Sequence, residues 1–293
     1  MVKKSQLAYV YTALAILLWG STASVSKLIL QDISSIQLIF YSFPFTIFGL
    51  FLIMLFQGKL KNLTTYKKED IGKLAGMGFL GCFLYYLFLF GAIERTSAQE
   101  AFVVNYLWPV MVVIFGVLLL KEKFTWRTFI SILLSFVGVA IVVSKGELMS
   151  LDNLNLTAIL MAASGALVYG LFSVLGKKLK YEVFSSMFCY YVFGFIYVLL
   201  SVLFFSEIPS LDMKQVAGLA WIGFFTNGLA FVFWFKALEV GETAKVSNLV
   251  FLTPFVSLIF IYFLVGEPIL SSSIIGLLFI VLGVFIQSYR KKN

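Results

Sequence analysis

Polar and aromatic side chains that could bind a small molecule lie inside long apolar stretches of this sequence. The clearest group is the motif Asn-Tyr-Leu-Trp-Pro from Asn105 to Pro109, within a stretch that is almost wholly apolar from Ala98 to Leu120. At a rise of about 1.5 Å per residue, a helix of that length crosses a hydrocarbon core of about 30 Å. An amide, an indole N–H and a helix-breaking proline inside lipid each need local partners or a wet cavity. The motif therefore predicts a cavity inside a membrane-spanning protein.

Three residues of this motif each have two interpretations. Trp108 lies well inside the apolar stretch, so its indole N–H must find a partner in a packed core or point into a cavity. The amide of Asn105 must be paired, either with an adjacent helix or with the polar group of a substrate. Pro109 removes a backbone donor and frees the carbonyl of Asn105, which creates either a static kink or a hinge. Pro254 is a second predicted hinge of the same kind.

Other apolar stretches contain further residues of the predicted substrate-binding site. Tyr86 and Trp234 have packing as an alternative role, because many of the 33 Phe and 14 Tyr residues simply face lipid or fill the core. The complete predicted set is Trp19, Tyr85, Tyr86, Asn105, Tyr106, Trp108, Tyr169, Asn227, Trp234 and Asn248.

The sequence offers little for enzymatic or metal chemistry. It has no histidine, no paired carboxylates inside an apolar stretch, no glycine-rich phosphate loop and no cluster of metal-ligand residues. Cys82 and Cys189 both lie in apolar stretches, where a free packed thiol is expected. We therefore expect no catalytic residues, no cofactor and no metal.

The composition is that of an integral membrane protein. Only 12% of the 293 residues are charged and 61% are hydrophobic, and the mean hydropathy is +1.01. A soluble domain carries about twice that share of charge. We interpret the net charge of +8 as the result of Lys and Arg residues that set the membrane topology, rather than as a sign of a nucleic-acid-binding surface. The expected partners are the lipid bilayer and a small-molecule substrate, with no nucleic acid.

Windows of about 20 apolar residues predict an all-α membrane protein with ten transmembrane helices. The predicted spans are 8–29, 35–56, 72–93, 98–120, 126–144, 155–175, 184–205, 214–237, 243–265 and 271–288. With both termini in the cytoplasm, 18 of the 22 Lys and Arg residues face inward. The positive-inside rule therefore predicts this topology. The four outward residues are Lys27, Arg95, Lys145 and Lys214.

The second half of the chain repeats the first. Several identical residues recur 145 positions later without a gap, including Ala92 and Ala237, Glu94 and Glu239, Pro109 and Pro254, Glu122 and Glu267, and Gly138 and Gly283. Each half holds five predicted spans, and an odd number means that the second half enters the membrane from the opposite face. We therefore expect two inverted five-helix repeats, residues 1–148 and 149–293, with a substrate site between them near the midplane.

These features resemble the drug/metabolite transporter superfamily, EamA type. The resemblance rests on the ten spans, the inverted halves, Trp19-Gly20 in the first span, and a proline-bearing fourth and ninth span each followed by a Glu. The motif from Asn105 to Pro109 is similar, more narrowly, to the aromatic and neutral amino acid exporter branch. The resemblance implies a central cavity bounded mainly by spans one, three, four, six, eight and nine. The second copy of the motif reads Val-Phe-Leu-Thr-Pro at 250–254, so we expect an asymmetric site.

Together these patterns predict a secondary transporter of the bacterial inner (cytoplasmic) membrane that works by alternating access. Its expected substrates are small amphipathic metabolites, with neutral or aromatic amino acids first, and the resemblance implies export. A multidrug or organic-cation exporter should place a carboxylate in the cavity, and the nearest is Glu100, which we expect to reach water at the membrane surface. A nucleobase exporter is also compatible. A passive channel needs a continuous polar pore, which these spans lack. The sequence leaves the oligomeric state open and allows a monomer.

Overall fold

The computed structural model describes residues 4–144, 155–241, 246 and 249–288. Within these ranges the chain is helical and contains no strand. Two shorter apolar helices, Thr253–Val265 and Ser271–Ile286, follow eight helical segments that are long and apolar enough to cross a membrane. The eight are Gln6–Ile29, Ser35–Phe56, Lys68–Arg95, Ala98–Leu120, Trp126–Val143, Leu156–Leu179, Val183–Phe205 and Met213–Val240.

The predicted spans agree closely with these segments. The windows 35–56 and 98–120 are reproduced at both ends, and the other six of the first eight windows fall on the matching long segments. The ninth and tenth windows contain the two shorter helices, and part of the ninth lies outside the described residues.

Several of these segments consist of consecutive elements, because the backbone hydrogen-bonding pattern changes inside them. The third and eighth segments each contain a π-helical stretch between two α-helices, and the fourth is interrupted by a turn. The elements are α1 (Lys4–Gly20), α2 (Thr22–Ile29), α3 (Ser35–Phe56), η1 (Leu60–Thr65), α4 (Lys68–Met77), η2 (Gly78–Leu84), α5 (Tyr85–Arg95), α6 (Ala98–Asn105), α7 (Trp108–Leu120), α8 (Trp126–Val143), α9 (Leu156–Leu179), α10 (Val183–Phe205), α11 (Met213–Ala220), η3 (Trp221–Leu229), α12 (Ala230–Val240), α14 (Thr253–Phe260), η4 (Ile261–Val265) and α15 (Ser271–Ser288).

Both predicted hinge prolines stand where a new helix begins. α6 ends at Asn105, a turn follows, and α7 begins at Trp108 with Pro109 in its first turn. Pro254 likewise lies in the first turn of α14, after a turn in the chain. A proline is well tolerated there because its missing N–H would have no intrahelical partner. The feature at each proline is therefore a break between two helices rather than a kink in one. Whether these breaks bend during transport remains a prediction.

Close contacts between helices are reciprocal across the two halves. A Cβ on Gly20 would collide with Val256, and a Cβ on Gly170 would collide with Met111. The glycines are 150 residues apart and their partners are 145 apart, so each contact is the repeat image of the other. Such reciprocity is the mark of a two-fold relation between the halves. Two more pairs obey it: Gly78 against Tyr190 with Gly223 against Ser42, and Gly138 against Gly276 with Gly283 against Ser131.

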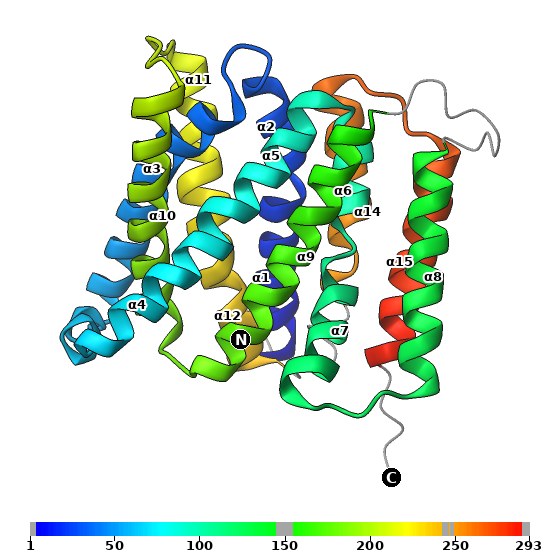
Figure 1. The fold of residues 1–293 in the computed structure, drawn as a ribbon, viewed down its shortest axis with the longest axis horizontal. Helices are drawn as coiled ribbons and strands as arrows, with labels where there is room; N and C mark the ends of the chain where they lie inside the picture. The colour runs from blue at the N-terminus through cyan, green and yellow to red at the C-terminus, as the bar shows by residue number, and fades with distance from the viewer. Residues whose placement is uncertain (1–3, 145–154, 242–245, 247–248, 289–293) are drawn as a thin grey trace.

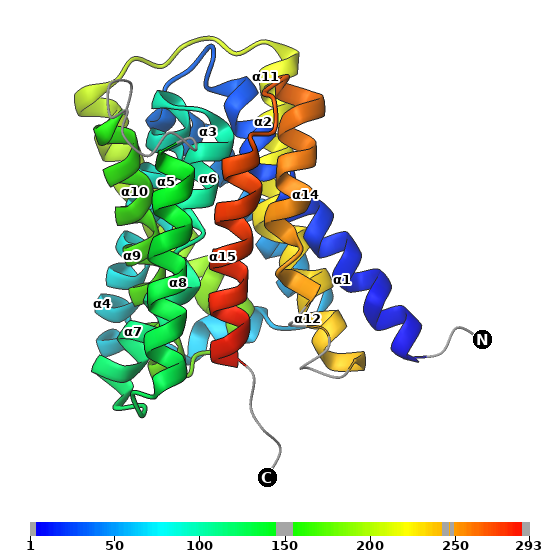
Figure 2. The same cartoon turned by 90° about the vertical axis from the view of Figure 1, so that its right-hand side faces the viewer.

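The helices form one bundle (Figure 1). α1 begins and α15 ends at the same end of the bundle, and α2 ends at the opposite one. α8 and α15 pack side by side along one flank, and α1 packs along α12 (Figure 2). We call the upper end in Figure 1, where Lys27 lies in the last turn of α2, the Lys27 end. The lower end, where Lys59 follows α3, is the Lys59 end.

Candidate substrate-binding cavity

A cavity of about 390 Å³ lies inside the bundle and is lined from both halves of the chain. The structure brings nine of the ten predicted site residues to its walls. They are Trp19, Tyr85, Tyr86, Asn105, Tyr106, Trp108, Tyr169, Asn227 and Trp234. Asn248, the tenth, lies outside the described residues.

Sequence reasoning missed the contribution of α10, the seventh span. Phe184, Met187 and Tyr191 all line the cavity. Their spacing of three and four residues puts them on one helical face, and this stripe was the available signal. It was hidden because α10 is apolar and aromatic around its whole circumference. Other lining residues outside the predicted set include Thr22, Leu50, Phe102, Phe172, Thr226, Phe231, Val250 and Thr253.

Two groups of aromatic rings form the walls. On one side Trp108 meets Tyr169 edge-on, with ring centroids 5.2 Å apart, and Tyr169 lies 4.6 Å from Tyr85. On the other side Trp19 lies 6.0 Å from Trp234. Rings at these separations pack favourably against one another. The walls suit an apolar or aromatic body.

Asn105 is already paired within the protein. Its Nδ2 donates to the carbonyl oxygen of Ala162 at 3.2 Å, and its Oδ1 accepts from the hydroxyl of Tyr85 at 3.4 Å. The side chain is 4% exposed and joins α6 to α9. Of the two roles open to this amide, the structure favours the bond to a neighbouring helix.

Asn227, in the π-helical stretch η3, is the second amide of the cavity. Its Oδ1 accepts from the hydroxyl of Tyr86 at 2.9 Å, and the hydroxyls of Tyr86 and Tyr191 lie 2.8 Å apart. The repeat counterpart of Asn227, 145 residues earlier, is Cys82 in the π-helical stretch η2. Both positions line the cavity, so the polar group is carried by only one of the two halves.

Among the described residues, none that lines this cavity carries a formal charge. Glu100 does not line it. The expectation that Glu100 reaches water was wrong, because its side chain is buried with 6% exposed. It lies in the first turn of α6, where one carboxylate oxygen accepts from the hydroxyls of Thr96 at 2.6 Å and Ser97 at 3.3 Å.

At the Lys27 end, hydrogen bonds join the two halves of the chain. One carboxylate oxygen of Glu267 accepts from the backbone N–H of Ala98 at 2.8 Å and the other accepts from the N–H of Gln99 at 3.3 Å. The side chain of Gln99 donates to the carbonyl of Pro268 at 2.9 Å. A carboxylate at a helix N-terminus satisfies free N–H groups and interacts favourably with the helix dipole. We call these contacts the Glu267 latch.

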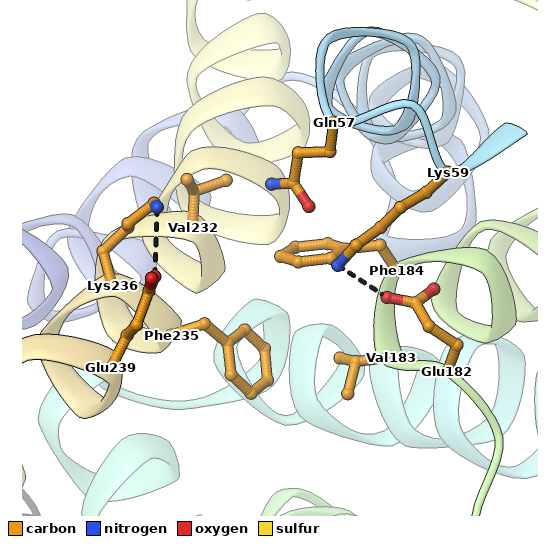
Figure 3. A pocket seen from close by; sticks show the side chains of 9 residues that line it. All are labelled: Gln57, Lys59, Glu182, Val183, Phe184, Val232, Phe235, Lys236 and Glu239. Atoms are coloured by element: carbon orange, nitrogen blue, oxygen red, sulfur yellow. Dashed lines mark hydrogen bonds and ion pairs between the residues drawn. The ribbon is translucent and has the colours of Figure 1, made fainter.

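A second pocket of about 260 Å³ adjoins the cavity at the Lys59 end (Figure 3). The two pockets share Val183, Phe184 and Phe235 in their linings. The Phe184 and Phe235 rings are 5.6 Å apart, centroid to centroid. Two ion pairs border this pocket, Lys59 with Glu182 at 2.8 Å and Lys236 with Glu239 at 3.0 Å. We call this second pocket the vestibule. The cavity therefore has the vestibule on one side and the Glu267 latch on the other.

Comparison with known proteins places this architecture among transporters. The family model described as the EamA-like transporter family matches residues 6–144 and again residues 156–289. Similar proteins include an uncharacterized transporter of Archaeoglobus fulgidus, 24% identical over 95% of this chain and 96% of its own length. Another is the uncharacterized transporter YetK of Bacillus subtilis, 26% identical over 100% of this chain and 90% of its own. A solved crystal structure aligns over 97% of both chains with a TM-score of 0.69 and 19% sequence identity, a likeness that shows a shared fold.

Proposed function

The chain belongs to the EamA-like transporter family, and we propose that it is a secondary transporter that exports neutral or aromatic amino acids by alternating access. The observation that carries this proposal is the uncharged, aromatic-walled cavity between the two halves. A volume of about 390 Å³ lies within the usual range for small-molecule sites, about 300–1,000 Å³.

The chemistry of the cavity matches an amino acid that is neutral overall. Its aromatic rings supply apolar contact for a side chain, and their faces attract an ammonium group. Hydroxyl and amide groups on the same walls can bind a carboxylate. A substrate with a net charge would be desolvated there without an opposite charge, which is costly.

The unequal ends of the cavity support alternating access. The Glu267 latch joins the halves at the Lys27 end, and the vestibule adjoins the cavity at the Lys59 end. In the proposed cycle the latch breaks while the Lys59 end closes. The reciprocal glycine contacts support such a cycle, because two halves related by a two-fold axis can exchange conformations.

We further propose that the two shorter helices belong to the ninth and tenth membrane spans, with both termini in the cytoplasm. The charge bias supports this topology, since 18 of the 22 Lys and Arg residues then face inward. The Lys59 end is then the cytoplasmic end. The relatives in Bacillus subtilis support a bacterial cytoplasmic membrane as the location.

An organic-cation exporter and a nucleobase exporter are the alternative functions. The first is disfavoured because no carboxylate of the described residues lines the cavity. The second remains compatible with the aromatic walls, on which a flat base can stack.

A thermal-stability screen of the purified protein tests these alternatives together. L-Phenylalanine, L-leucine, phenethylamine, adenine and L-glutamate are each added, and the melting temperature is measured. A ligand at 100 times its dissociation constant stabilises a folded protein by about 2.7 kcal/mol. We expect L-phenylalanine and L-leucine to raise the melting temperature and L-glutamate to leave it unchanged. Stabilisation by adenine or phenethylamine alone would move the assignment to the corresponding alternative.

Transport in liposomes separates a transporter from a channel. Vesicles preloaded with unlabelled L-phenylalanine should accumulate labelled L-phenylalanine above its external concentration, because alternating access exchanges one molecule for another. A passive channel would only equilibrate the label.

A further inference from the structure

Two residues that line the cavity have a buried polar side-chain atom without a partner in the described part of the chain, Nδ2 of Asn227 and Oγ1 of Thr253. Asn227 is 4% exposed and lines the cavity, and its Nδ2 has no hydrogen-bond partner among the residues that the structure describes. Both N–H bonds of a primary amide are normally satisfied when the group is buried. Leaving a buried donor unpaired costs about 1–3 kcal/mol. Such a group in a ligand cavity calls for an acceptor on the ligand.

The orientation of this amide follows from counting hydroxyl protons. Within the described part of the chain, the hydroxyl of Tyr191 bonds only to the hydroxyl of Tyr86. Tyr191 must therefore donate to Tyr86, since otherwise its own proton would be buried without an acceptor. Tyr86 then donates its proton to Asn227, which must present its oxygen. The chain Tyr191 to Tyr86 to Asn227 Oδ1 thus fixes the Nδ2 group as the free end.

We propose that Asn227 Nδ2 is the polar anchor of the cavity and donates hydrogen bonds to the carboxylate of the transported amino acid. This assignment rests on the proposed function and names the group that recognises the substrate. Tyr86 and Tyr191 are positioning residues that hold the amide in its donating orientation. Asn105, whose amide bonds to Ala162 and Tyr85, fastens α6 to α9 instead.

The anchor defines the substrate class more narrowly than the cavity alone. A donor amide favours a molecule with an acceptor at one end, and the aromatic walls favour an apolar body and accept an ammonium group at a ring face. A simple amine has the body and the cation but leaves Asn227 unpaired. A zwitterionic amino acid satisfies all three features.

Two probes that share a ring and an amine test the anchor on the purified, full-length protein. L-Phenylalanine carries a carboxylate and phenethylamine lacks it, and the affinity of each is measured by isothermal titration calorimetry. Hydrogen bonds to a charged group contribute about 1.5–3 kcal/mol, which corresponds to about 10- to 100-fold in affinity. We expect the wild type to bind L-phenylalanine at least about tenfold more tightly than phenethylamine.

Asn227→Asp is the decisive variant because it keeps the oxygen that accepts from Tyr86 and replaces only the donor. It should lower the preference for L-phenylalanine by about tenfold or reverse it, since a carboxylate would then face a carboxylate. Asn227→Ala, which also removes the donor, should abolish the preference and serves as a second variant if the aspartate impairs folding. Cys189→Ala is the control, because Cys189 does not line the cavity. It should leave the preference unchanged.

The possible outcomes distinguish this inference from the proposed function. If the wild type binds L-phenylalanine and both Asn227 variants keep its preference over phenethylamine, Asn227 is not the anchor and the transporter assignment stands. If the wild type binds phenethylamine as tightly as L-phenylalanine, the anchor is likewise wrong. If the wild type binds neither probe, the amino-acid substrate class fails and this inference fails with it.

Discussion

Trp108 combines two properties at the scale of a single residue: it lines the cavity and its ring rests edge-on against Tyr169. Truncation of Trp108 would remove part of the cavity wall and leave the Asn105 hydrogen bond between α6 and α9 intact. We expect Trp108→Ala to weaken binding of L-phenylalanine by about 1–3 kcal/mol, the scale of a lost aromatic contact. Isothermal titration calorimetry on the purified variant measures the change.

Trp126→Ala is the control for that experiment. Trp126 is 71% exposed at the start of α8 and does not line the cavity. It should leave the affinity as it was. If the Trp108→Ala variant folds and keeps the wild-type affinity, Trp108 is a packing residue and not part of the binding site.

The two amides show what the sequence could and could not predict at this scale. Asn105 and Asn227 are both polar residues in apolar spans, and this pattern predicted both as site residues; both line the cavity. The sequence pattern cannot show which amide is hydrogen-bonded within the protein, because that depends on contacts between distant segments. Asn105 meets a carbonyl on α9, whereas the Nδ2 of Asn227 meets none in the described part of the chain. The hydrogen bonds in the structure therefore distinguish the two amides.

At the scale of elements, the Glu267 latch joins the segment between η4 and α15 in the second half to the start of α6 in the first. The repeat predicted that Glu122 and Glu267 are equivalent, and in the structure they are used differently. Glu122 pairs with Lys177 at 2.9 Å, with both side chains more than half exposed. Glu267 instead caps α6. A sequence duplicated at both positions cannot specify which of the two ends is closed.

Removing the latch should therefore open the Lys27 end. Ala101, one turn into α6 and 1% exposed, is replaced by Cys in a protein whose Cys82 and Cys189 are replaced by Ala. Adding Glu267→Ala removes hydrogen bonds to a charged group, worth about 1.5–3 kcal/mol. We expect a membrane-impermeant maleimide to react with the new thiol about tenfold faster.

Glu239→Ala is the matched control at the opposite end. Glu239 forms an exposed ion pair with Lys236, which contributes little. An equal rate for the Glu267 variant and this control would show that the latch does not hold the Lys27 end closed.

Glu182, the N-cap residue of α10 at the Lys59 end, gives a pH-dependent prediction. Partial burial acts to raise the pKa of its carboxyl, but bonds from Lys59 and Ser185 outweigh this and lower the pKa below its ordinary value. The ionised form therefore stabilises the fold above the unfolded pKa, about 4.3. This stabilisation is lost as the pH falls through the folded pKa.

Melting temperatures of the wild type and Glu182→Gln from pH 7 to pH 3 measure this effect. At pH 7 the wild type should be more stable, by at most about 1 kcal/mol because the ion pair is partly exposed. The difference should shrink below pH 4, and raising the salt concentration should reduce it at pH 7. A difference that stays constant across the range would contradict the assignment.

At the scale of the whole molecule, the two-fold arrangement could be predicted from the sequence because a duplicated chain repeats its contacts. The offsets of 145 and 150 residues reappear as the reciprocal contacts of Gly20 with Val256 and Gly170 with Met111. The π-helical stretches η2 and η3 were not predicted, because hydrophobic periodicity does not distinguish them from α-helix. They occur at equivalent positions in both halves, so they belong to the repeated fold.

Membrane topology is the prediction that belongs to the whole chain. The bias of 18 of 22 Lys and Arg residues predicts that reporter fusions after Lys61 and Lys178 lie in the cytoplasm and that one after Ser150 lies outside. Fusions after Leu270 and after Asn293 together test the two shorter helices. Thr253–Val265 contains 13 residues, or about 20 Å of helix, which is less than a hydrocarbon core of about 30 Å. If both the ninth and tenth segments cross, the reporter after Leu270 is outside and the C-terminal reporter is cytoplasmic, whereas both are cytoplasmic if neither segment crosses. If only one crosses, the C-terminal reporter is outside and the prediction of five spans in each half is wrong. An outside signal at Lys61 would reverse the predicted orientation and with it the proposed direction of export.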